Sequence, residues 1–156
     1  MSSRQQNGHG KCSNLFQMTH ERTSEARPDS TDRKVPRILV VDDAEDTRVL
    51  YATFLSFSGL TVEEASDGEM ALHSIAKSPP DLVVMDLAMP RVDGWETTRL
   101  IKSNPRTQNV RVIVVTSNAM PDQVAKARAA GADEVLTKPC LPDTLLASVR
   151  EVLARR

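Results

Sequence analysis

The feature that most limits how this chain can fold is an alternation of short apolar runs with longer helix-like stretches, repeated five times from residue 37 onward. The apolar runs are "RILVVD" (37–42), "LTVEEA" (60–65), "DLVVMD" (81–86), "VRVIVVT" (110–116) and "ADEVLT" (132–137). They are rich in Val, Ile and Leu, and three of them have the continuous apolar character of strands buried on both faces of a parallel sheet. The stretches that we predict to be helices are 45–58, 68–78, 94–103, 121–130 and 142–154. Five strand–helix units in a row predict an α/β fold of (βα)5 type, with a doubly wound, five-stranded parallel sheet and right-handed crossovers.

Local signals mark the ends of the predicted helices. Pro121 and Pro142 stand where two helices begin, a position at which proline gives up no helical hydrogen bond. Gly59 and Gly131 follow the ends of two others and suit the left-handed conformation that often terminates a helix. The sequence "SDGE" (66–69) has the spacing of a capping box, which predicts that its serine caps the helix that follows.

Residues 1–36 differ in character from the rest of the chain. They are polar and unpatterned, with six basic and four acidic residues, and Leu15, Phe16 and Met18 are their main bulky apolar residues. Such a segment buries too little apolar surface to offset the entropy lost on ordering. We therefore predict a disordered N-terminal tail over 1–36 and one globular domain over 37–156. The tail either carries a short docking motif around "NLFQM" or has no role of its own, and the sequence leaves both interpretations open.

Composition excludes several classes of protein for this chain. The hydrophobic content is 40% and the aromatic content only 3%, so the core must be mostly aliphatic. A formal net charge of −1 gives no general attraction to nucleic acid or to anionic membranes. No apolar run approaches the roughly 18 residues of a membrane span, and the N-terminus lacks the apolar region of a secretory signal. Cys12 and Cys140 are far apart and match no metal-ligand spacing, so we expect reduced, unpaired thiols in a cytoplasmic protein that binds neither nucleic acid nor membrane.

Polar residues gather where the predicted strands end. The first strand runs into Asp42 and Asp43, the third ends in Asp86, the fourth ends in Thr116, and the fifth is followed by Lys138. In a doubly wound sheet, ligands bind outside the carboxyl ends of the strands. Three carboxylates, a hydroxyl and an ammonium are therefore expected to converge on one edge of the sheet.

The chemistry of this set points to phosphoryl transfer. Three neighbouring carboxylates repel one another unless a cation holds them, and such hard oxygen ligands suit Mg²⁺, which also accepts phosphate oxygens. Lys138 adds a positive charge that can pair with an acid or with a phosphoryl oxygen. A carboxylate that faces Mg²⁺ and lysine can act as a nucleophile towards phosphorus. Thr116 could then donate a hydrogen bond to a phosphoryl oxygen.

These residues lie in four sequences that resemble the receiver domain of two-component response regulators. The sequences are "ILVVDDAED", "PDLVVMDLAMPRVDGWE", "VIVVTSNA" and "GADEVLTKPC". Their order and spacing make the resemblance specific, and it covers residues 37–154. The resemblance implies a flavodoxin-like receiver topology with strand order 2-1-3-4-5, in a single-domain regulator similar to the chemotaxis regulators.

The resemblance assigns roles to the acidic residues. Asp86 matches the phosphoacceptor of the family. Asp42 and Asp43 match the acids that bind Mg²⁺, Asp43 the more directly, and Asp86 would share the same metal ion. The backbone carbonyl of Ala88 matches a further metal ligand.

The resemblance also covers the ends of the fourth and fifth strands. Thr116 matches the switch hydroxyl, Lys138 matches the lysine that binds the phosphoryl group, and the bond between Lys138 and Pro139 is often cis in the family. One position departs from the pattern, because many receivers carry Tyr or Phe three residues before the lysine and this chain has Val135. Valine has no ring to move and is stiff at χ1. We therefore expect phosphorylation to be signalled through loop position, or through Thr116 and the 117–122 loop.

Together these features predict a stand-alone response regulator that accepts a phosphoryl group on Asp86 and then changes its binding to partners. We expect no output domain, because the last predicted helix ends close to Arg156. The expected partners are a histidine kinase or histidine phosphotransfer protein as phosphodonor, and a downstream protein that the sequence does not identify. The chain would not be an enzyme for other substrates, since it would catalyse only its own phosphoryl transfer and autodephosphorylation.

Three other functions compete with this interpretation. An aspartate-nucleophile phosphatase needs a second acid two residues after the nucleophile, and this chain has Ala88 there. A nucleotide or flavin binder needs Gly, Ser or Thr in the loop after the first strand, and this chain has "DDAED". A degenerate receiver that works as a protein-interaction scaffold without phosphorylation is opposed by the intact acids, Thr116 and Lys138, but Val135 keeps it open.

Overall fold

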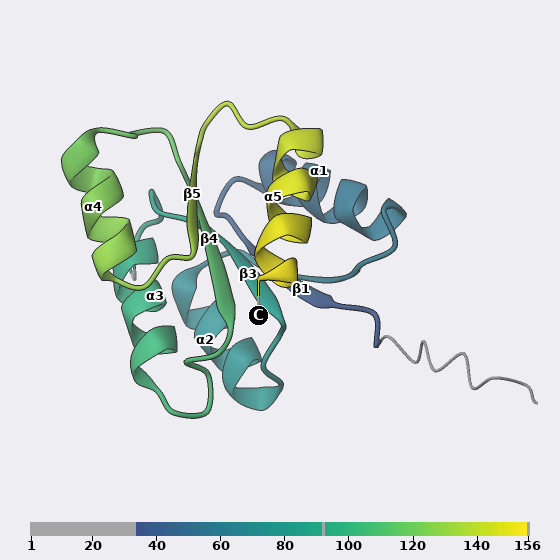
Figure 1. The fold of residues 1–156 in the computed structure, drawn as a ribbon, viewed down its shortest axis with the longest axis horizontal. Coiled ribbons are helices and arrows are strands. Elements are labelled where there is room, and N and C mark those ends of the chain that lie inside the picture. Colours follow the sequence, from purple (N-terminus) through teal and green to yellow (C-terminus); the bar gives the residue numbers. More distant parts are fainter. Residues whose placement is uncertain (1–33, 92, 156) are drawn as a thin grey trace, which may run out of the picture. The chain divides into compact units, whose positions relative to one another are not determined.

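In the computed structural model, which describes residues 34–91 and 93–155, five strands form one parallel sheet (Figure 1). The strands are β1 (Arg37–Val41), β2 (Thr61–Ala65), β3 (Leu82–Asp86), β4 (Arg111–Thr116) and β5 (Glu134–Thr137). Their order across the sheet is β2-β1-β3-β4-β5, and all four pairings are parallel. The predicted fold class and strand order are therefore confirmed.

Five helices connect and follow the strands in strict alternation. They are α1 (Glu45–Phe57), α2 (Gly68–Lys77), α3 (Gly94–Ser103), α4 (Pro121–Ala129) and α5 (Pro142–Ala154). Helices α1 and α5 lie on one face of the sheet, and α2, α3 and α4 lie on the other (Figure 1). No helix in the described part of the chain has the length and apolar composition needed to cross a bilayer.

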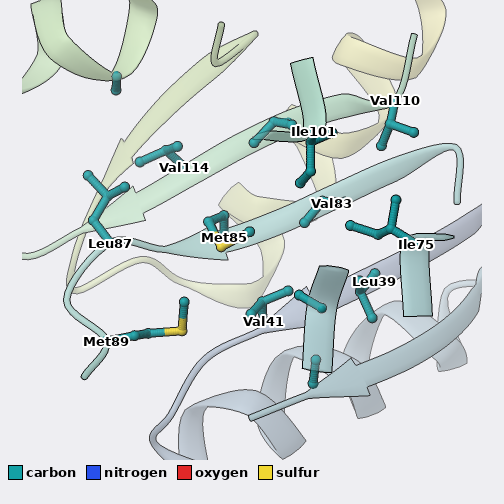
Figure 2. Close-up of a cluster of buried hydrophobic side chains, with 14 residues drawn as sticks. Leu39, Val41, Ile75, Val83, Met85, Leu87, Met89, Ile101, Val110 and Val114 are labelled. Atoms are coloured by element: carbon teal, nitrogen blue, oxygen red, sulfur yellow. The ribbon is translucent and has the colours of Figure 1, made fainter. Parts of the chain in front are cut away.

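The two faces of the sheet carry two separate aliphatic cores. Successive side chains of a strand point to opposite faces, so Ile38 and Val40 of β1 pack with α1 and α5, whereas Leu39 and Val41 pack on the other side. Figure 2 shows the second cluster, in which side chains from β1, β3 and β4 meet those of α2 and α3. The strands β1, β3 and β4 are buried almost throughout, which explains their continuous apolar sequences.

The helix ends agree with the sequence signals in four places and differ in one. Prolines begin α4 and α5, and Gly59 and Gly131 have positive φ angles of 88° and 102° after α1 and α4. The predicted serine cap of α2 is wrong, because Asp67 directly precedes the helix and its Oδ1 accepts a hydrogen bond of 2.8 Å from the Met70 N–H. Ser66 instead donates its hydroxyl to the Met70 sulfur.

The predicted disordered tail lies outside the described residues, apart from residues 34–36. In this short stretch the Pro36 carbonyl accepts a hydrogen bond of 3.0 Å from the Thr61 N–H of β2. The chain is thus attached to the sheet one residue before β1 begins.

Candidate functional site

Three aspartates converge at the carboxyl edge of the sheet. Asp42 and Asp43 directly follow β1, and Asp86 is the last residue of β3. These two strands are neighbours in the parallel sheet, so their carboxyl ends lie side by side. One carboxylate oxygen from each aspartate lies within 4.8 Å of one from each of the others. Asp42 and Asp86 are buried, with 3% and 4% of their surface exposed, whereas Asp43 is open to solvent.

Lys138 reaches this cluster from β5, which is separated from β3 by β4. Its Nζ lies 2.9 Å from Asp42 Oδ2 and 3.4 Å from Asp86 Oδ2. Burial disfavours the charged ammonium, but the hydrogen bond to Asp42 and the negative charge of Asp86 outweigh it and raise the pKa of Lys138. The lysine is therefore protonated at neutral pH and bridges the two buried carboxylates.

Asp86 is a buried carboxylate whose charge is only partly compensated. Burial raises the pKa of Asp86, while the Ala88 N–H and the Lys138 ammonium act in the opposite direction and only reduce the rise. The Ala88 N–H donates a hydrogen bond of 3.1 Å to Asp86 Oδ1. The Ala88 residue is exposed and brings no acidic side chain, so no general acid stands two residues after the candidate nucleophile.

Asp42 uses all four of its polar groups within the protein. Its N–H donates to the Ala65 carbonyl at 3.2 Å, and its carbonyl accepts from Arg48 Nη1 at 2.9 Å. Its Oδ1 accepts from the Ala44 N–H at 2.9 Å, and its Oδ2 accepts from Lys138. Asp42 is therefore a fixed anchor of the site, and Asp43 is the neighbouring carboxylate that faces solvent.

Thr116 lies at the end of β4, beside the end of β3. It is buried, and in the sheet it follows Val115, which pairs with Asp86. Its hydroxyl accepts a hydrogen bond of 3.1 Å from the Asn118 N–H and donates one of 3.3 Å to the Asn118 carbonyl. In this structure the hydroxyl therefore binds the loop after β4.

Val135 occupies a half-buried position on β5. It pairs with Val114 of β4 and packs, like Trp95 of α3, against the core cluster shown in Figure 2. An aliphatic side chain thus fills the position at which many receivers carry a ring.

The segment that carries Lys138 is held against α1. The peptide bond between Lys138 and Pro139 is cis, and the carbonyl of the next residue, Cys140, accepts a hydrogen bond of 2.9 Å from the hydroxyl of Tyr51. Tyr51 is buried on α1, and burial is the main cause that raises its pKa. Sequence reasoning missed this contact, because 89 residues separate the two partners.

Gly94 fits a space that admits no side chain. A Cβ atom at this position would lie 2.3 Å from the Asp86 carbonyl oxygen and 2.8 Å from the Leu87 Cα. The sequence "DG" indicates a turn here, but it does not reveal that the start of α3 touches the backbone of the candidate phosphoacceptor. In the loop between them, Arg91 has a positive φ of 71°, a conformation that a non-glycine residue adopts only at a cost.

The residues of this edge fit a divalent cation with oxygen ligands. Mg²⁺ is usually bound by one or two carboxylates and by water, and it retains positions for phosphate oxygens. The exposed Asp43 carboxylate, Asp86 and the backbone carbonyl of Ala88 would hold it, with Asp42 behind them. The lysine alone leaves the three carboxylates with excess negative charge, which a divalent cation would balance.

Comparison with known proteins agrees with the family resemblance found in the sequence. The family model for the response regulator receiver domain matches residues 38–150. The chain is 41% identical over 119 residues to the response regulator MprA of Mycolicibacterium vanbaalenii, and 39% identical over 119 residues to MprA of Mycobacterium leprae. Each match covers 76% of this chain and 51% of the relative, so the chain spans about half the length of the curated relatives it matches.

Solved structures agree with the sequence relatives. The chemotaxis protein CheY4 of Vibrio cholerae matches with a TM-score of 0.73 and 29% identity, over 76% of this chain and 98% of that chain. A putative response regulator from Chloroflexus aurantiacus matches with a TM-score of 0.74 and 30% identity, over 78% of this chain and all of that chain.

Proposed function

This chain belongs to the response regulator receiver domain family, and we propose that Asp86 accepts a phosphoryl group from a histidine kinase or a histidine phosphotransfer protein in a Mg²⁺-dependent reaction. The resulting change in the loops around Asp86 then alters how the domain binds a downstream protein. The expectation of a single-domain regulator stays a prediction, since the curated relatives are about twice as long.

The observation that carries the proposal is the placement of Asp86. Its carboxylate is buried at the end of β3, within 4.8 Å of two further carboxylates, and Lys138 Nζ lies 3.4 Å from its Oδ2. Such a cluster destabilises the fold when no cation is bound, because like charges repel more strongly away from water. It suits a site whose partner is a cation together with a phosphoryl group.

The transfer step is a displacement at phosphorus. A carboxylate oxygen of Asp86 attacks the phosphorus of the phosphohistidine, a new O–P bond forms, and the P–N bond to the imidazole breaks. The imidazole leaves with the electron pair of that bond and takes up a proton from water. Hydrolysis reverses the modification, since water attacks the phosphorus, inorganic phosphate leaves, and the Asp86 carboxylate is restored.

The surrounding residues bind and orient the transferred group. The Lys138 ammonium pairs with a phosphoryl oxygen in place of one of its present carboxylate contacts. Thr116 leaves its bonds to Asn118 and donates its hydroxyl to another phosphoryl oxygen, which draws the loop after β4 towards the site. A bound Mg²⁺ would neutralise negative charge on the transferring group.

The proposed role is that of a switch in the cytoplasm. The domain catalyses its own phosphorylation and dephosphorylation and does not turn over another substrate. The missing acid at Ala88 supports this, because a phosphatase of the aspartate type would need it to protonate the leaving group.

A second candidate is a receiver that binds partners without phosphorylation. The observation that favours it is Val135, whose half-buried side chain packs into the core and has no ring that could change position. In that case the acids would still bind Mg²⁺, but partner binding would not respond to modification of Asp86.

Intact mass measured after incubation with Mg²⁺ and phosphoramidate tests the proposal. The expected result is the gain of one phosphoryl group, absent without Mg²⁺ and absent in Asp86→Asn. A folded protein that binds Mg²⁺ but gains no mass from phosphoramidate or from any cognate kinase would favour the scaffold. A gain that persists in Asp86→Asn would place the acceptor elsewhere.

A further inference from the structure

Arg48 is the charged residue of α1 that reaches back to the acidic site. It lies in the first turn of the helix, and only 15% of its side chain is exposed. Its Nη1 donates a hydrogen bond of 2.9 Å to the backbone carbonyl of Asp42. Its Nε lies 3.3 Å from Oε2 of Glu64 on the edge strand β2. The guanidinium therefore joins the helix, the turn after β1 and the edge of the sheet.

The carbonyl that Arg48 binds belongs to the peptide plane between Asp42 and Asp43. The other polar groups of Asp42 are held by Ala65, Ala44 and Lys138, which fix residue 42 itself. The bond from Arg48 acts on the next unit of the chain, since rotation of this plane about the Cα–C bond of Asp42 moves the Cα of Asp43 and with it the exposed carboxylate.

We propose that Arg48 is a positioning residue for Asp43: oriented by Glu64, it fixes the peptide plane between Asp42 and Asp43 and so aims the Asp43 carboxylate at the divalent cation. The inference rests on the proposed function, and it adds a residue that touches neither the metal nor the phosphoryl group. Residues that orient metal ligands in this way affect metal affinity about tenfold to a hundredfold.

The sign of the effect separates this role from simple electrostatics. A cation near a metal site repels Mg²⁺, so removal of its charge alone would tighten Mg²⁺ binding. Loss of a positioning contact weakens binding instead, because Asp43 must be ordered each time the metal binds. The two explanations therefore predict opposite changes in the same dissociation constant.

Calorimetric titration of the full chain with Mg²⁺ measures this difference directly. Arg48→Met is expected to weaken Mg²⁺ affinity about tenfold. Arg48→Lys should recover part of the loss, since one ammonium can reach the carbonyl but cannot reproduce the fork that also meets Glu64. Arg150→Met removes an exposed arginine from α5 and should leave the affinity within about twofold of the original.

The rate of phosphoryl gain from phosphoramidate supplies the second measurement. In Arg48→Met the Mg²⁺ concentration for half-maximal rate should rise about tenfold, while the rate at saturating Mg²⁺ stays within about twofold. Urea unfolding shows which variants are folded. If Arg48→Met does not fold, Arg48→Lys serves in its place, because it keeps the charge and electrostatics alone would leave the affinity unchanged; it should weaken Mg²⁺ affinity about twofold to threefold. Unchanged or tighter Mg²⁺ binding in a folded Arg48 variant would overturn the role of Arg48. Failure of the original protein to take up a phosphoryl group, with normal Mg²⁺ binding, would instead contradict the proposed function.

Discussion

The two edges of the sheet hold a half-buried aspartate, Asp133, and a buried one, Asp86, in opposite electrostatic surroundings. At the amino edge, Asp133 before β5 receives Lys102 Nζ at 2.9 Å, Arg111 Nη1 at 3.0 Å and the Val112 N–H at 2.8 Å. Burial opposes ionisation, but these donors outweigh it and lower the pKa of Asp133. At the carboxyl edge three carboxylates lie together, Lys138 contacts two of them, and burial raises the pKa of Asp86.

One end of the sheet therefore holds charges that stabilise the fold, and the other end holds the candidate functional site. At the amino edge the Asp133 carboxylate is paired with two cations and a backbone N–H, so no negative charge is left for a ligand. The carboxyl edge has excess negative charge, and that excess is available to a ligand.

Removal of the carboxylate at the amino edge should cause the largest loss of stability. Asp133→Ala leaves Lys102 and Arg111 partly buried without their anion, and we expect the free energy of unfolding to fall by about 3 kcal/mol. Asp43→Asn, which removes a charge from the crowded edge, should change it by less than about 1 kcal/mol in metal-free protein. Urea unfolding of both variants measures the difference, and equal losses would contradict the comparison.

Added Mg²⁺ should stabilise the carboxyl edge alone. A ligand that binds only the folded state at about thirtyfold its dissociation constant raises the free energy of unfolding by about 2 kcal/mol. We expect this gain in the original protein and in Asp133→Ala, and its loss in Asp43→Asn. Thermal or urea unfolding with and without Mg²⁺ tests the prediction; a gain that survives in Asp43→Asn would place the cation elsewhere.

Asp133 and Asp86 should give opposite dependences of stability on pH. Because the pKa of Asp133 is lowered in the folded state, the ionised carboxylate adds to the free energy of unfolding above the unfolded-state pKa, about 3.9. This contribution is lost as pH falls through the folded-state pKa. Because the pKa of Asp86 is raised in the folded state, its protonated carboxyl adds to the free energy of unfolding below the unfolded-state pKa. This contribution is lost as pH rises through the folded-state pKa. The free energy of unfolding is measured in metal-free urea titrations from about pH 3 to 7. Asp133→Asn should reduce its loss at acid pH, and Asp86→Asn should remove its decline above about pH 4. The same pH profile in both variants would refute the assignment.

The smallest effect is expected in the loop after β3. Arg91 has a φ of 71°, which costs a side-chain-bearing residue about 1 kcal/mol, and glycine would relieve it at some cost in chain entropy. Arg91→Gly should therefore raise the free energy of unfolding by about 0.5 kcal/mol, while the equivalent change at the exposed helical Arg99 should lower it. A loss of stability in Arg91→Gly would mean that the arginine side chain makes a stabilising contact.

The sequence predicts the fold well because its signals are local and repeated. The strands β1, β3 and β4 are readable as apolar runs, and prolines and glycines mark helix ends where the structure has them. The site is predictable for the same reason, since parallel strands bring their carboxyl ends to one edge and the acids stand at those ends.

What sequence reasoning missed depends on contacts that only the folded chain defines. In the sequence Arg48 is only an arginine within a predicted helix, and the structure shows that it donates a hydrogen bond to the Asp42 carbonyl. The Tyr51 hydroxyl donates to the Cys140 carbonyl, 89 positions along the chain. The choice of Asp67 over Ser66 as helix cap depends on a shift of one residue in the helix start, which the capping-box spacing does not fix. No local pattern distinguishes these residues from ordinary helix and turn residues.

The contact between Gly94 and Asp86 has a consequence for how such a chain can diverge. The roles proposed for Asp86, Lys138 and Thr116 constrain these residues through their chemistry, whereas Gly94 has no proposed chemical role. It is constrained because any side chain would meet the carbonyl oxygen of Asp86 and displace the acceptor. A substitution at the first residue of α3 can therefore disturb the proposed function while every group proposed to react is unchanged.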